Sequence, residues 1–263
     1  MRWFALAVWL AACGFEHGAA TSDPTDASRP IDAPADVRAI VDAPSAPPCH
    51  ASDASLVWCL ELDEPNLATA ATALDSSGLH HDPSIANVAT TTRSVPASSQ
   101  AITLTTSSTL SLAKPSDFDL QSFTITAWVR RSSNSELGIV DTSKQYTMSI
   151  TNTDHTVECA LSNGSQTVSY DGSAQTGMGE WDLVACTYDQ SEVCEYSFRN
   201  GSASGQSGCS GRNQTTPTIG TLTTVGSWAD GTSHFVGDVD QVRLYSRALT
   251  QQEICTAGGL TGC

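Results

Sequence analysis

Basic side chains are scarce in this sequence. The 263 residues include 12 lysines and arginines, only two of them lysines, against 28 aspartates and glutamates, which gives a formal net charge of −16. So acidic a surface repels nucleic acid and anionic lipid, and we therefore expect neither as a partner. The acidity does suit calcium, whose ligands are carboxylate and carbonyl oxygens, although charge alone does not define a site.

Common catalytic and metal-binding motifs are missing as well. The sequence has no HExxH, no glycine-rich phosphate loop and no CxxC pair, and its histidines do not stand at metal-ligand spacing beside cysteines. The segment GSASG at 201–205 has Ala203 where the nucleophile elbow GxSxG requires serine. These features argue against a zinc site, a serine hydrolase and a phosphate-binding enzyme.

One acidic segment, ELDE at 61–64, has the alternating acids that jelly-roll glycosidases carry on one strand. A retaining glycosidase needs two carboxyl groups about 5–5.5 Å apart. Glu61 and Asp63 share a face of the expected strand, but the next residue on that face is Pro65. Glu64 points to the other face. We therefore predict that the chain is not an enzyme, with a degenerate glycoside hydrolase as the less favoured alternative.

No apolar run is long enough to cross a bilayer as a helix, which takes about 20 residues. The first run covers residues 3–12, follows Arg2 and ends in the segment LAAC, whose last residue is Cys13. A charged start, a short apolar run and small residues before a cleavage site predict a secretory signal peptide. LAAC resembles the lipobox of bacterial lipoproteins. This resemblance implies that residues 1–13 form the signal segment and that Cys13 carries the lipid.

The resemblance also implies a location. Gly14 stands where lipoproteins retained at the inner membrane often carry aspartate. We therefore expect a lipid-anchored protein of the bacterial envelope, at the outer membrane or the cell surface, whose only contact with the membrane is the anchor. An ordinary signal peptide cleaved near Ala12 is the alternative.

Residues 14–48 differ in composition from the rest of the chain. They hold six of the 11 prolines and are otherwise rich in alanine, aspartate and serine. Such a segment cannot bury enough apolar surface to offset the entropy lost on ordering, which predicts an extended, partly polyproline-II tether. The remaining residues, 49–263, suit one large domain.

The chain has nine cysteines, an odd number that needs an explanation in a secreted protein. If Cys13 is the lipid carrier, eight remain: Cys49, Cys59, Cys159, Cys186, Cys194, Cys209, Cys255 and Cys263. Eight cysteines can form four disulfides in an oxidising compartment. We favour Cys159–Cys186 between strands and Cys194–Cys209 across a loop. The other four either close two local loops, Cys49–Cys59 and Cys255–Cys263, or join the first and last strands.

Helical periodicity is almost absent from residues 49–263. Short alternating runs, such as SFTITAWVR (122–130) and WDLVACTY (181–188), recur between clusters of glycine, serine, asparagine and aspartate. More than ten such runs predict an all-β, antiparallel two-sheet sandwich. The two tryptophans in these runs, Trp128 and Trp181, are expected in the core rather than on a ligand platform.

Five segments resemble, in their order and spacing, laminin-G-like, concanavalin A-like jelly rolls. They are LVWCLELDE (56–64), DSSG (75–78), SFTITAWVR (122–130), WDLVACTYDQSEVCEYSFRNG (181–201) and FVGDVDQVRLYSRALTQQEI (235–254). The resemblance covers residues 50–256 and implies two antiparallel sheets packed face to face. Members of this family mostly bind glycans or proteins. The chain departs from the family in its cysteine set and in SFRNG, where the family has YVNG.

The last of these segments contains a break in its alternation. Phe235 and Val239 share one parity, whereas Val242 and Leu244 share the other. A bulge at Asp240–Gln241 would absorb this slip, and bulges redirect side chains near sites.

A helix start follows that strand. Thr250 with Glu253 three residues later forms a capping box, and Leu249 can pack on Ile254. A glycine pair, 258–259, then ends the helix. One short C-terminal helical turn is therefore expected.

Two interpretations of Asp238 and Asp240 remain open. One is a solvated edge strand that carries negative charge. The other is a structural calcium site at the rim of the sandwich, because the resemblance implies calcium bound through an aspartate here and through oxygens of the early turn. The matching candidate ligands are Asp240, Asp75, Asp63 and Glu64. Calcium is the one cofactor that we expect.

The sequence thus predicts a cell-surface lipoprotein that presents a jelly-roll binding module for a glycan or an extracellular protein. A purely structural envelope lipoprotein is the alternative. Specificity in this fold depends on the rim loops, so the sequence does not name the ligand.

Overall fold

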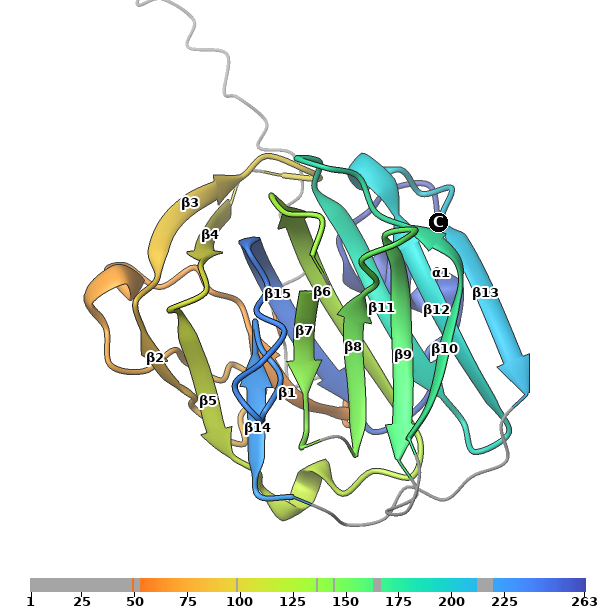
Figure 1. Ribbon diagram of the computed structural model, residues 1–263, viewed down its shortest axis with the longest axis horizontal. Helices are drawn as coiled ribbons and strands as arrows, with labels where there is room; N and C mark the ends of the chain where they lie inside the picture. Colours follow the sequence, from red (N-terminus) through yellow and green to blue (C-terminus); the bar gives the residue numbers. More distant parts are fainter. Residues whose placement is uncertain are drawn as a thin grey trace, which may run out of the picture. The chain divides into compact units, whose positions relative to one another are not determined.

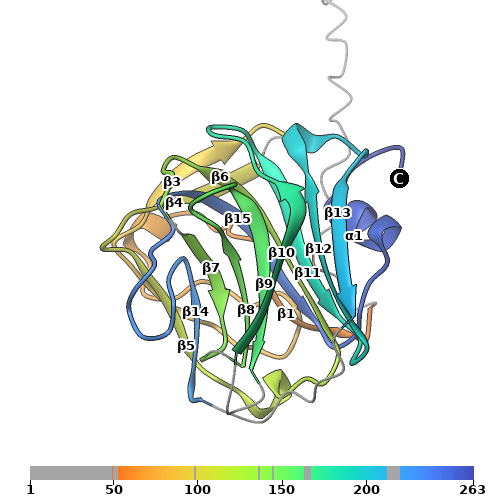
Figure 2. The ribbon, with the colours of Figure 1, turned by 45° about the vertical axis from the view of Figure 1, so that its right-hand side comes forward.

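In the computed structural model, the described residues are 49, 53–97, 99–135, 137–143, 145–162, 167–211 and 220–263. They form two antiparallel sheets that face each other, with one short α-helix near the C-terminus (Figures 1 and 2). The antiparallel two-sheet sandwich predicted from the alternating runs is confirmed. No helix in the described part of the chain is long and apolar enough to span a membrane.

The eight-stranded sheet consists of β1 (Leu56–Leu60), β3 (Ala89–Arg93), β4 (Ser99–Leu104), β6 (Phe123–Arg131), β11 (Asp182–Tyr188), β12 (Glu192–Phe198), β13 (Gln206–Gly211) and β15 (Gly237–Tyr245). Across the sheet the order is β13-β12-β11-β6-β15-β4-β3, and β1 pairs with β15 off this path.

The seven-stranded sheet consists of β2 (Ser84–Ala86), β5 (Thr109–Ala113), β7 (Leu137–Asp141), β8 (Tyr146–Ile150), β9 (Thr156–Ser162), β10 (Thr167–Gln175) and β14 (Leu222–Val225). Its order is β10-β9-β8-β7-β14-β5-β2. The helical segments are η1 (Leu67–Thr69), η2 (Ser116–Phe118), η3 (Arg199–Gly201) and α1 (Gln251–Ala257).

β15 is a central strand of the eight-stranded sheet. It pairs with β6 on one side, and on the other side first with β4 and then with β1. Its register shifts between Asp240 and Arg243, and Gln241 adopts a φ of 47°, so the predicted bulge is confirmed. Because of this bulge, Val239 and Leu244 both lie in the main core despite their opposite parity.

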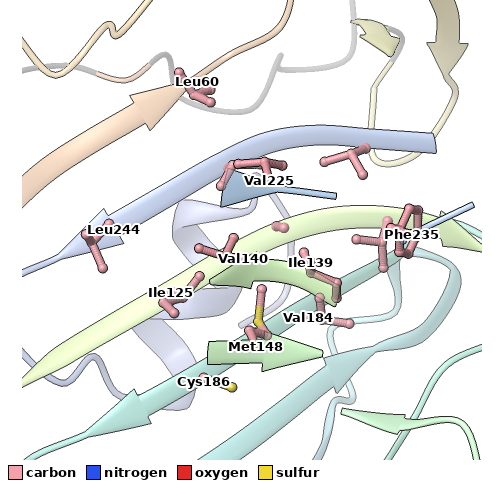
Figure 3. Packing of buried hydrophobic residues seen from close by; sticks show 14 of the residues in the cluster. Leu60, Ile125, Ile139, Val140, Met148, Val184, Cys186, Val225, Phe235 and Leu244 are labelled. Atoms are coloured by element: carbon pink, nitrogen blue, oxygen red, sulfur yellow. The ribbon is translucent and has the colours of Figure 1, made fainter. Parts of the chain in front are cut away.

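The main core lies between the two sheets. Figure 3 shows Ile125 and Leu244 from the eight-stranded sheet packing with Ile139 and Met148 from the seven-stranded sheet. All four side chains are at most 3% exposed. Burying each such side chain favours folding by about 1.5–3 kcal/mol, so this interface is the main source of stability.

A second buried cluster lies on the other side of the eight-stranded sheet. It includes Trp128, Trp181 and Leu183 of the sheet region together with Ile254 of α1. Because successive strand residues point to opposite faces, Trp128 cannot share the main core with its neighbours in β6. The prediction that both tryptophans are buried is confirmed, at 0% and 3% exposure.

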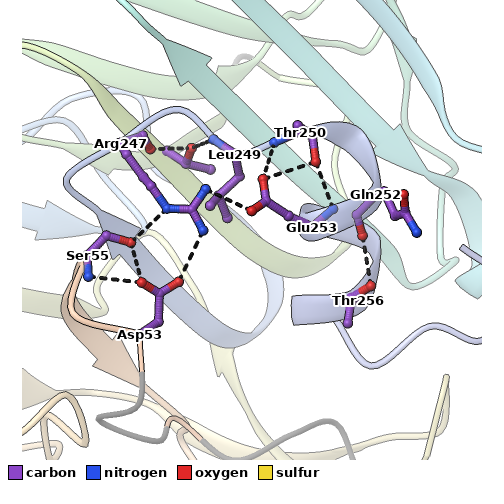
Figure 4. A network of polar contacts seen from close by, with 9 residues as sticks. Asp53, Ser55, Arg247, Leu249, Thr250, Gln252, Glu253 and Thr256 are labelled. Carbon is purple, nitrogen blue, oxygen red and sulfur yellow. Dashed lines mark hydrogen bonds and ion pairs between the residues drawn. The ribbon is translucent and has the colours of Figure 1, made fainter.

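The capping box at the start of α1 is confirmed. The Thr250 side chain accepts from the Glu253 amide, and the Glu253 carboxylate accepts from the Thr250 amide. Glu253 also pairs with Arg247 at 2.9 Å, and Arg247 contacts Asp53 at 3.3 Å and Ser55 at 3.2 Å (Figure 4). The helix is therefore tied to the segment that precedes β1.

The eight cysteines after Cys13 form four disulfides: Cys49–Cys59, Cys159–Cys186, Cys194–Cys209 and Cys255–Cys263. Cys159–Cys186 and Cys194–Cys209 are the two pairs favoured from the sequence. For the other four cysteines, the structure has the alternative with two local loops, Cys49–Cys59 and Cys255–Cys263. Cys159 lies in β9 and Cys186 in β11, so this disulfide joins the two sheets. The lipobox with Cys13 and the tether at 14–48 lie outside the described residues.

Candidate functional site

We call the side of the eight-stranded sheet that carries Thr124, Trp128 and Arg130 the outer face. The chain around α1 covers one part of it. The Trp128 indole donates to the Gly258 carbonyl oxygen at 3.2 Å, and the Thr124 hydroxyl donates to the Arg247 carbonyl oxygen at 2.8 Å. Farther along β6, the Arg130 side chain is 32% exposed. The part of the outer face around Arg130 is therefore accessible to solvent.

A row of side chains crosses the outer face, formed by the buried Arg93, Asp240 and Trp128 and the half-buried Ser99. Arg93 Nε donates to Asp240 Oδ2 at 2.6 Å, and Ser99 Oγ donates to the same oxygen at 2.8 Å. The Arg93 guanidinium lies 4.9 Å from the centre of the Trp128 ring. The Arg93 side chain crosses β4 to reach from β3 to β15. It crosses at the small side chain of Ala101, which belongs to the second buried cluster.

The surroundings of Asp240 are therefore those of a structural carboxylate. The Arg93 and Asp240 side chains are 1% and 0% exposed. Burial raises the pKa of Asp240 to about 6, and the charge of Arg93 and the hydroxyl of Ser99 oppose that increase. The interpretation of Asp240 as a solvated edge charge is wrong, because β15 has a neighbouring strand on each side.

A second row, which we call the exposed row, runs beside the first: Arg130, Thr103 and Thr91 are partly exposed, whereas its other two members, Trp181 and Asp238, are buried. Arg130 Nε donates to Asp238 Oδ2 at 2.6 Å, and Thr103 Oγ1 donates to Asp238 Oδ1 at 2.5 Å. Arg130 Nη2 also donates to Thr91 Oγ1 at 3.4 Å, and the guanidinium lies 5.0 Å from the Trp181 ring centre. The solvated-edge interpretation is wrong for Asp238 too, because its side chain is only 12% exposed.

Two open depressions flank the exposed row. The threonine depression is lined by Thr90, Thr91, Thr92, Ser99 and Gln100. The methionine depression is lined by Arg130, Arg131, Ser132, Met178, Gly179 and Asp238. The hydrogen bond between Arg130 and Thr91 connects their linings. Met178 is 47% exposed and is one of three large apolar side chains that are exposed among the described residues.

The comparisons with known proteins identify the family. A family model described as the concanavalin A-like lectin/glucanases superfamily matches residues 104–255, more than half of the chain. The chain belongs to this superfamily. β15 and three members of the exposed row, Arg130, Trp181 and Asp238, lie within the matched region, whereas Thr91 and Thr103 precede it. A search of curated proteins found no match.

Solved structures of similar fold include one domain of an arabinanase. Domain 4 of AbnA, a GH43 extracellular arabinanase from Geobacillus stearothermophilus, described in complex with arabinotriose, is 17% identical with a TM-score of 0.58. The alignment covers 78% of this chain and 98% of that chain. At this identity the likeness shows the fold alone.

Two toxin structures are similar as well. The binding domain of Paraclostridial Mosquitocidal Protein 1 is 16% identical, with a TM-score of 0.56 and coverage of 76% of this chain and 51% of that chain. The binding domain of Botulinum neurotoxin DC, in complex with rat synaptotagmin II, is 12% identical, with a TM-score of 0.52 and coverage of 78% and 51%. This chain therefore spans about half the length of the toxin chains.

The four candidate calcium ligands are distributed over the first part of the chain and β15. Asp63 accepts from the Gln100 amide at 2.7 Å, close to Ser99, so that Asp63 and Asp240 have neighbouring partners in β4. Burial raises the pKa of Asp63; the Gln100 amide opposes this increase, and the charge of Glu61 adds to it.

The other two candidates hold backbone groups. Glu64 accepts from the Leu74 amide at 2.8 Å. Asp75 is 5% exposed and accepts from the amides of Cys59, Ser77 and His81, each at 2.9 Å. These bonds fix the DSSG turn against β1.

The four carboxylates do not meet at one point. Among the described residues, one group of three potential ligands has all its ligand atoms within 4.8 Å of one another, and it is Glu192 with Cys194 and Cys209. Those two cysteines are joined in a disulfide and are not free to bind a metal. Calcium binding through Asp240, Asp75, Asp63 and Glu64 thus stays a prediction.

Calcium binding can be tested by thermal unfolding. If calcium binds only the folded protein, a hundredfold excess over its Kd stabilises the fold by about 2.7 kcal/mol. For a domain of this size we expect the melting midpoint to rise by roughly 5–10 °C relative to a chelator at matched ionic strength. Asp63→Asn should reduce this shift. Identical midpoints with calcium and chelator would exclude the calcium site.

The three acidic side chains of the ELDE segment also accept hydrogen bonds from main-chain amides. Glu61 Oε1 accepts from the Cys49 amide at 2.6 Å, in addition to the bonds of Asp63 and Glu64 described above. Each of the three carboxylates thus has a main-chain donor. This arrangement differs from a pair of carboxylates that faces a substrate across an open cleft.

The arginines of the outer face are not among the site residues predicted from the sequence. Alternation in SFTITAWVR already places Arg130 on the same face as Trp128, so its position could have been read from the pattern. Its partner Asp238 is 108 residues away, and Arg93 is 147 residues from Asp240. Local patterns carry no signal for such pairings.

Proposed function

We propose that this chain is a carbohydrate-binding module and that its ligand lies along the exposed row of the outer face. The observation that carries this proposal is the partly exposed Arg130–Asp238 pair between two open depressions. The pair and the two threonines that bond to it come from β6, β15, β4 and β3, four neighbouring strands of one sheet. A site on such a rigid base presents its polar groups in a fixed geometry.

The chemistry of the exposed row suits sugar hydroxyls, which both donate and accept hydrogen bonds. The threonine depression offers hydroxyl and amide groups, each of which can both donate and accept hydrogen bonds. Asp238 supplies an ionised acceptor and Arg130 a planar donor, and bonds to charged groups are stronger than neutral ones. Met178 adds an apolar surface for the C–H groups of a sugar ring.

The solved structures of similar fold support a binding role. The arabinanase domain is described with a bound arabinotriose, and the toxin domains are described as binding domains. A protein ligand is the second candidate, because one toxin domain is described in complex with rat synaptotagmin II. The main-chain bonds of Glu61, Asp63 and Glu64 favour binding without hydrolysis.

A glycan array with the purified full-length protein in detergent tests the proposal. We expect binding to at least one class of oligosaccharide, and Arg130→Gln should weaken it about tenfold or more, because a hydrogen bond to a charged group contributes about 1.5–3 kcal/mol. The matched control is Arg247→Gln, which removes an arginine that is also ion-paired but lies between β15 and α1. Equal losses in both variants, or no glycan ligand at all, would contradict the proposal.

We also propose that the module is held at the cell surface by a lipid on Cys13. This rests on the LAAC segment and on the composition of residues 14–48. Cys13→Ala should move the protein from the membrane fraction to the soluble fraction, whereas Gly14→Ala should leave it membrane-bound. Continued fractionation of the Cys13→Ala protein with membranes would refute the anchor.

A further inference from the structure

Arg131, the last residue of β6, carries a buried charge with neutral partners. The residue is 5% exposed. Its Nε donates to Thr176 Oγ1 and its Nη2 to the Thr176 carbonyl oxygen, both at 3.2 Å. Its Nη1 donates to Asn134 Oδ1 at 2.8 Å and to the Ser133 carbonyl oxygen at 3.3 Å. Among the described residues, no carboxylate forms an ion pair with this guanidinium.

Such an arrangement is costly without a counter-charge. A guanidinium that is largely removed from water is normally paired with a carboxylate or another anion. Burial lowers the pKa of Arg131, while the charge of Asp182 opposes this effect and that of Arg199 adds to it. Both Asp182 oxygens already accept backbone amides, from Gly177 at 2.6 Å and Asn200 at 2.9 Å.

Arg131 also lines the methionine depression, next to Arg130. The lining contains these two cations and a single anion, Asp238, which is already paired with Arg130. This excess of positive charge occurs in a chain whose net charge is −16. A local cationic depression on an acidic protein attracts anions selectively, because the rest of the surface repels them.

We infer that the ligand is an acidic glycan, and that the methionine depression receives its carboxylate or sulfate group. This inference rests on the proposed carbohydrate-binding function and specifies its ligand class. The anionic group lies against Arg130 and the end of β6, where it adds to the charge of Asp182, which acts on Arg131 without forming an ion pair with it. The neighbouring sugar units extend over the exposed row to the hydroxyl groups of the threonine depression.

The hydroxyl-rich lining favours a glycan over an acidic peptide. The threonine depression offers three threonine side chains, one serine and one glutamine, but no exposed apolar side chain that would hold a peptide residue. Arg130 connects it to the methionine depression through Thr91 at 3.4 Å. The two depressions thus form one surface with an anion-binding end and a hydroxyl-binding end.

Replacing Asp238 tests whether the ligand is anionic, because the direction of the expected change in affinity is known. Its carboxylate competes with an anionic ligand for Arg130 and repels that ligand. Asp238→Asn removes the negative charge but keeps one oxygen acceptor for Arg130, and its amide NH2 can donate to the Thr103 hydroxyl. Affinity for an acidic glycan should therefore rise about fivefold, as expected from the loss of one like charge at a solvated distance of about 4 Å. Affinity for a neutral glycan should not rise.

The experiment is a titration of the full-length protein in detergent with two matched probe pairs. Oligogalacturonate is compared with its methyl ester, and sulfated dextran oligosaccharide with unmodified dextran. We expect the acidic member of at least one pair to bind about tenfold or more tightly than its neutral partner, with an affinity that falls as salt is added. The two pairs distinguish a carboxylate from a sulfate as the anionic group.

Variants separate this inference from the proposed function. Arg130→Gln should weaken binding of the acidic probe, Asp238→Asn should strengthen it, and Arg247→Gln should leave it unchanged; melting curves confirm that each variant is folded. Equal affinity for acidic and neutral probes, or no gain for Asp238→Asn, would overturn the acidic-ligand inference while leaving a glycan-binding function in place. No binding of any glycan would overturn both.

Discussion

Replacing Arg93 with methionine should lower the free energy of unfolding by about 3–5 kcal/mol, because it leaves the Asp240 carboxylate buried without its cation. The two side chains are 1% and 0% exposed, so water cannot take the place of the guanidinium. The variant also loses the contact of Arg93 with the Trp128 ring. Denaturant unfolding of the full-length protein, with its disulfides intact, measures the loss.

The same variant should change the pH dependence of stability. The pKa of Asp240 in the folded protein, about 6, lies above the ordinary value of 3.8. A raised carboxyl pKa contributes stability that is fully present below about pH 3.8 and is lost as the pH rises through about 6. Arg93 opposes this increase in pKa. Without it, the loss between about pH 5 and pH 7 should be larger than in the native protein.

A double variant provides the control for the ion pair. Arg93→Met combined with Asp240→Leu removes both charges and fills the space with apolar groups, an exchange that is often neutral or stabilising for buried ion pairs. We expect the double variant to be more stable than Arg93→Met alone and to lose the extra pH dependence. A double variant as unstable as the single one would show that Arg93 acts through its packing.

Removing the Cys159–Cys186 disulfide should cost about 3–4 kcal/mol. The two cysteines are 27 residues apart in the sequence, and their bond is the one among the four described disulfides that joins the two sheets. Its loss gives the unfolded chain more conformations and lets the sheets separate. Cys159→Ala/Cys186→Ala is compared with the native protein by denaturant unfolding under non-reducing conditions.

The matched control is the disulfide Cys255–Cys263 after α1. Its cysteines are eight residues apart, and the shorter closed loop predicts a smaller loss of about 2.5 kcal/mol for Cys255→Ala/Cys263→Ala. A loss for Cys159→Ala/Cys186→Ala that is equal or smaller would mean that packing of the main core, and not the covalent link, holds the sheets together.

Several features of the fold could be predicted because they depend on residues close in the sequence. The bulge at Asp240 and Gln241 follows from a slip of the apolar phase within one strand. The capping box of Thr250 and Glu253 spans a single helical turn. In both cases neighbouring residues contain the whole physical cause. Burial of Trp128, by contrast, depends on the chain around α1, 130 residues away, because alternation places Trp128 on the same face as Thr124 and Thr126.

The candidate site could not be predicted in the same way. The sequence allows Asp238 and Asp240 to be charges on an edge strand, because the residues of a strand do not show how many neighbouring strands it has. Pairing of β15 with β4 and β6 decides that question, and it depends on the order of strands in the sheet. The arginines that neutralise both aspartates come from strands more than 100 residues earlier.

The central place of β15 also has a consequence for synthesis. β15 pairs with β1, β4 and β6, all of which are translated before it. Until residues 237–245 have left the ribosome, β4 and β6 have no strand between them, and β1 has no partner in the sheet. Pairings over such sequence distances form slowly. Folding of the eight-stranded sheet is therefore a late event, completed after nearly the whole domain has been translated.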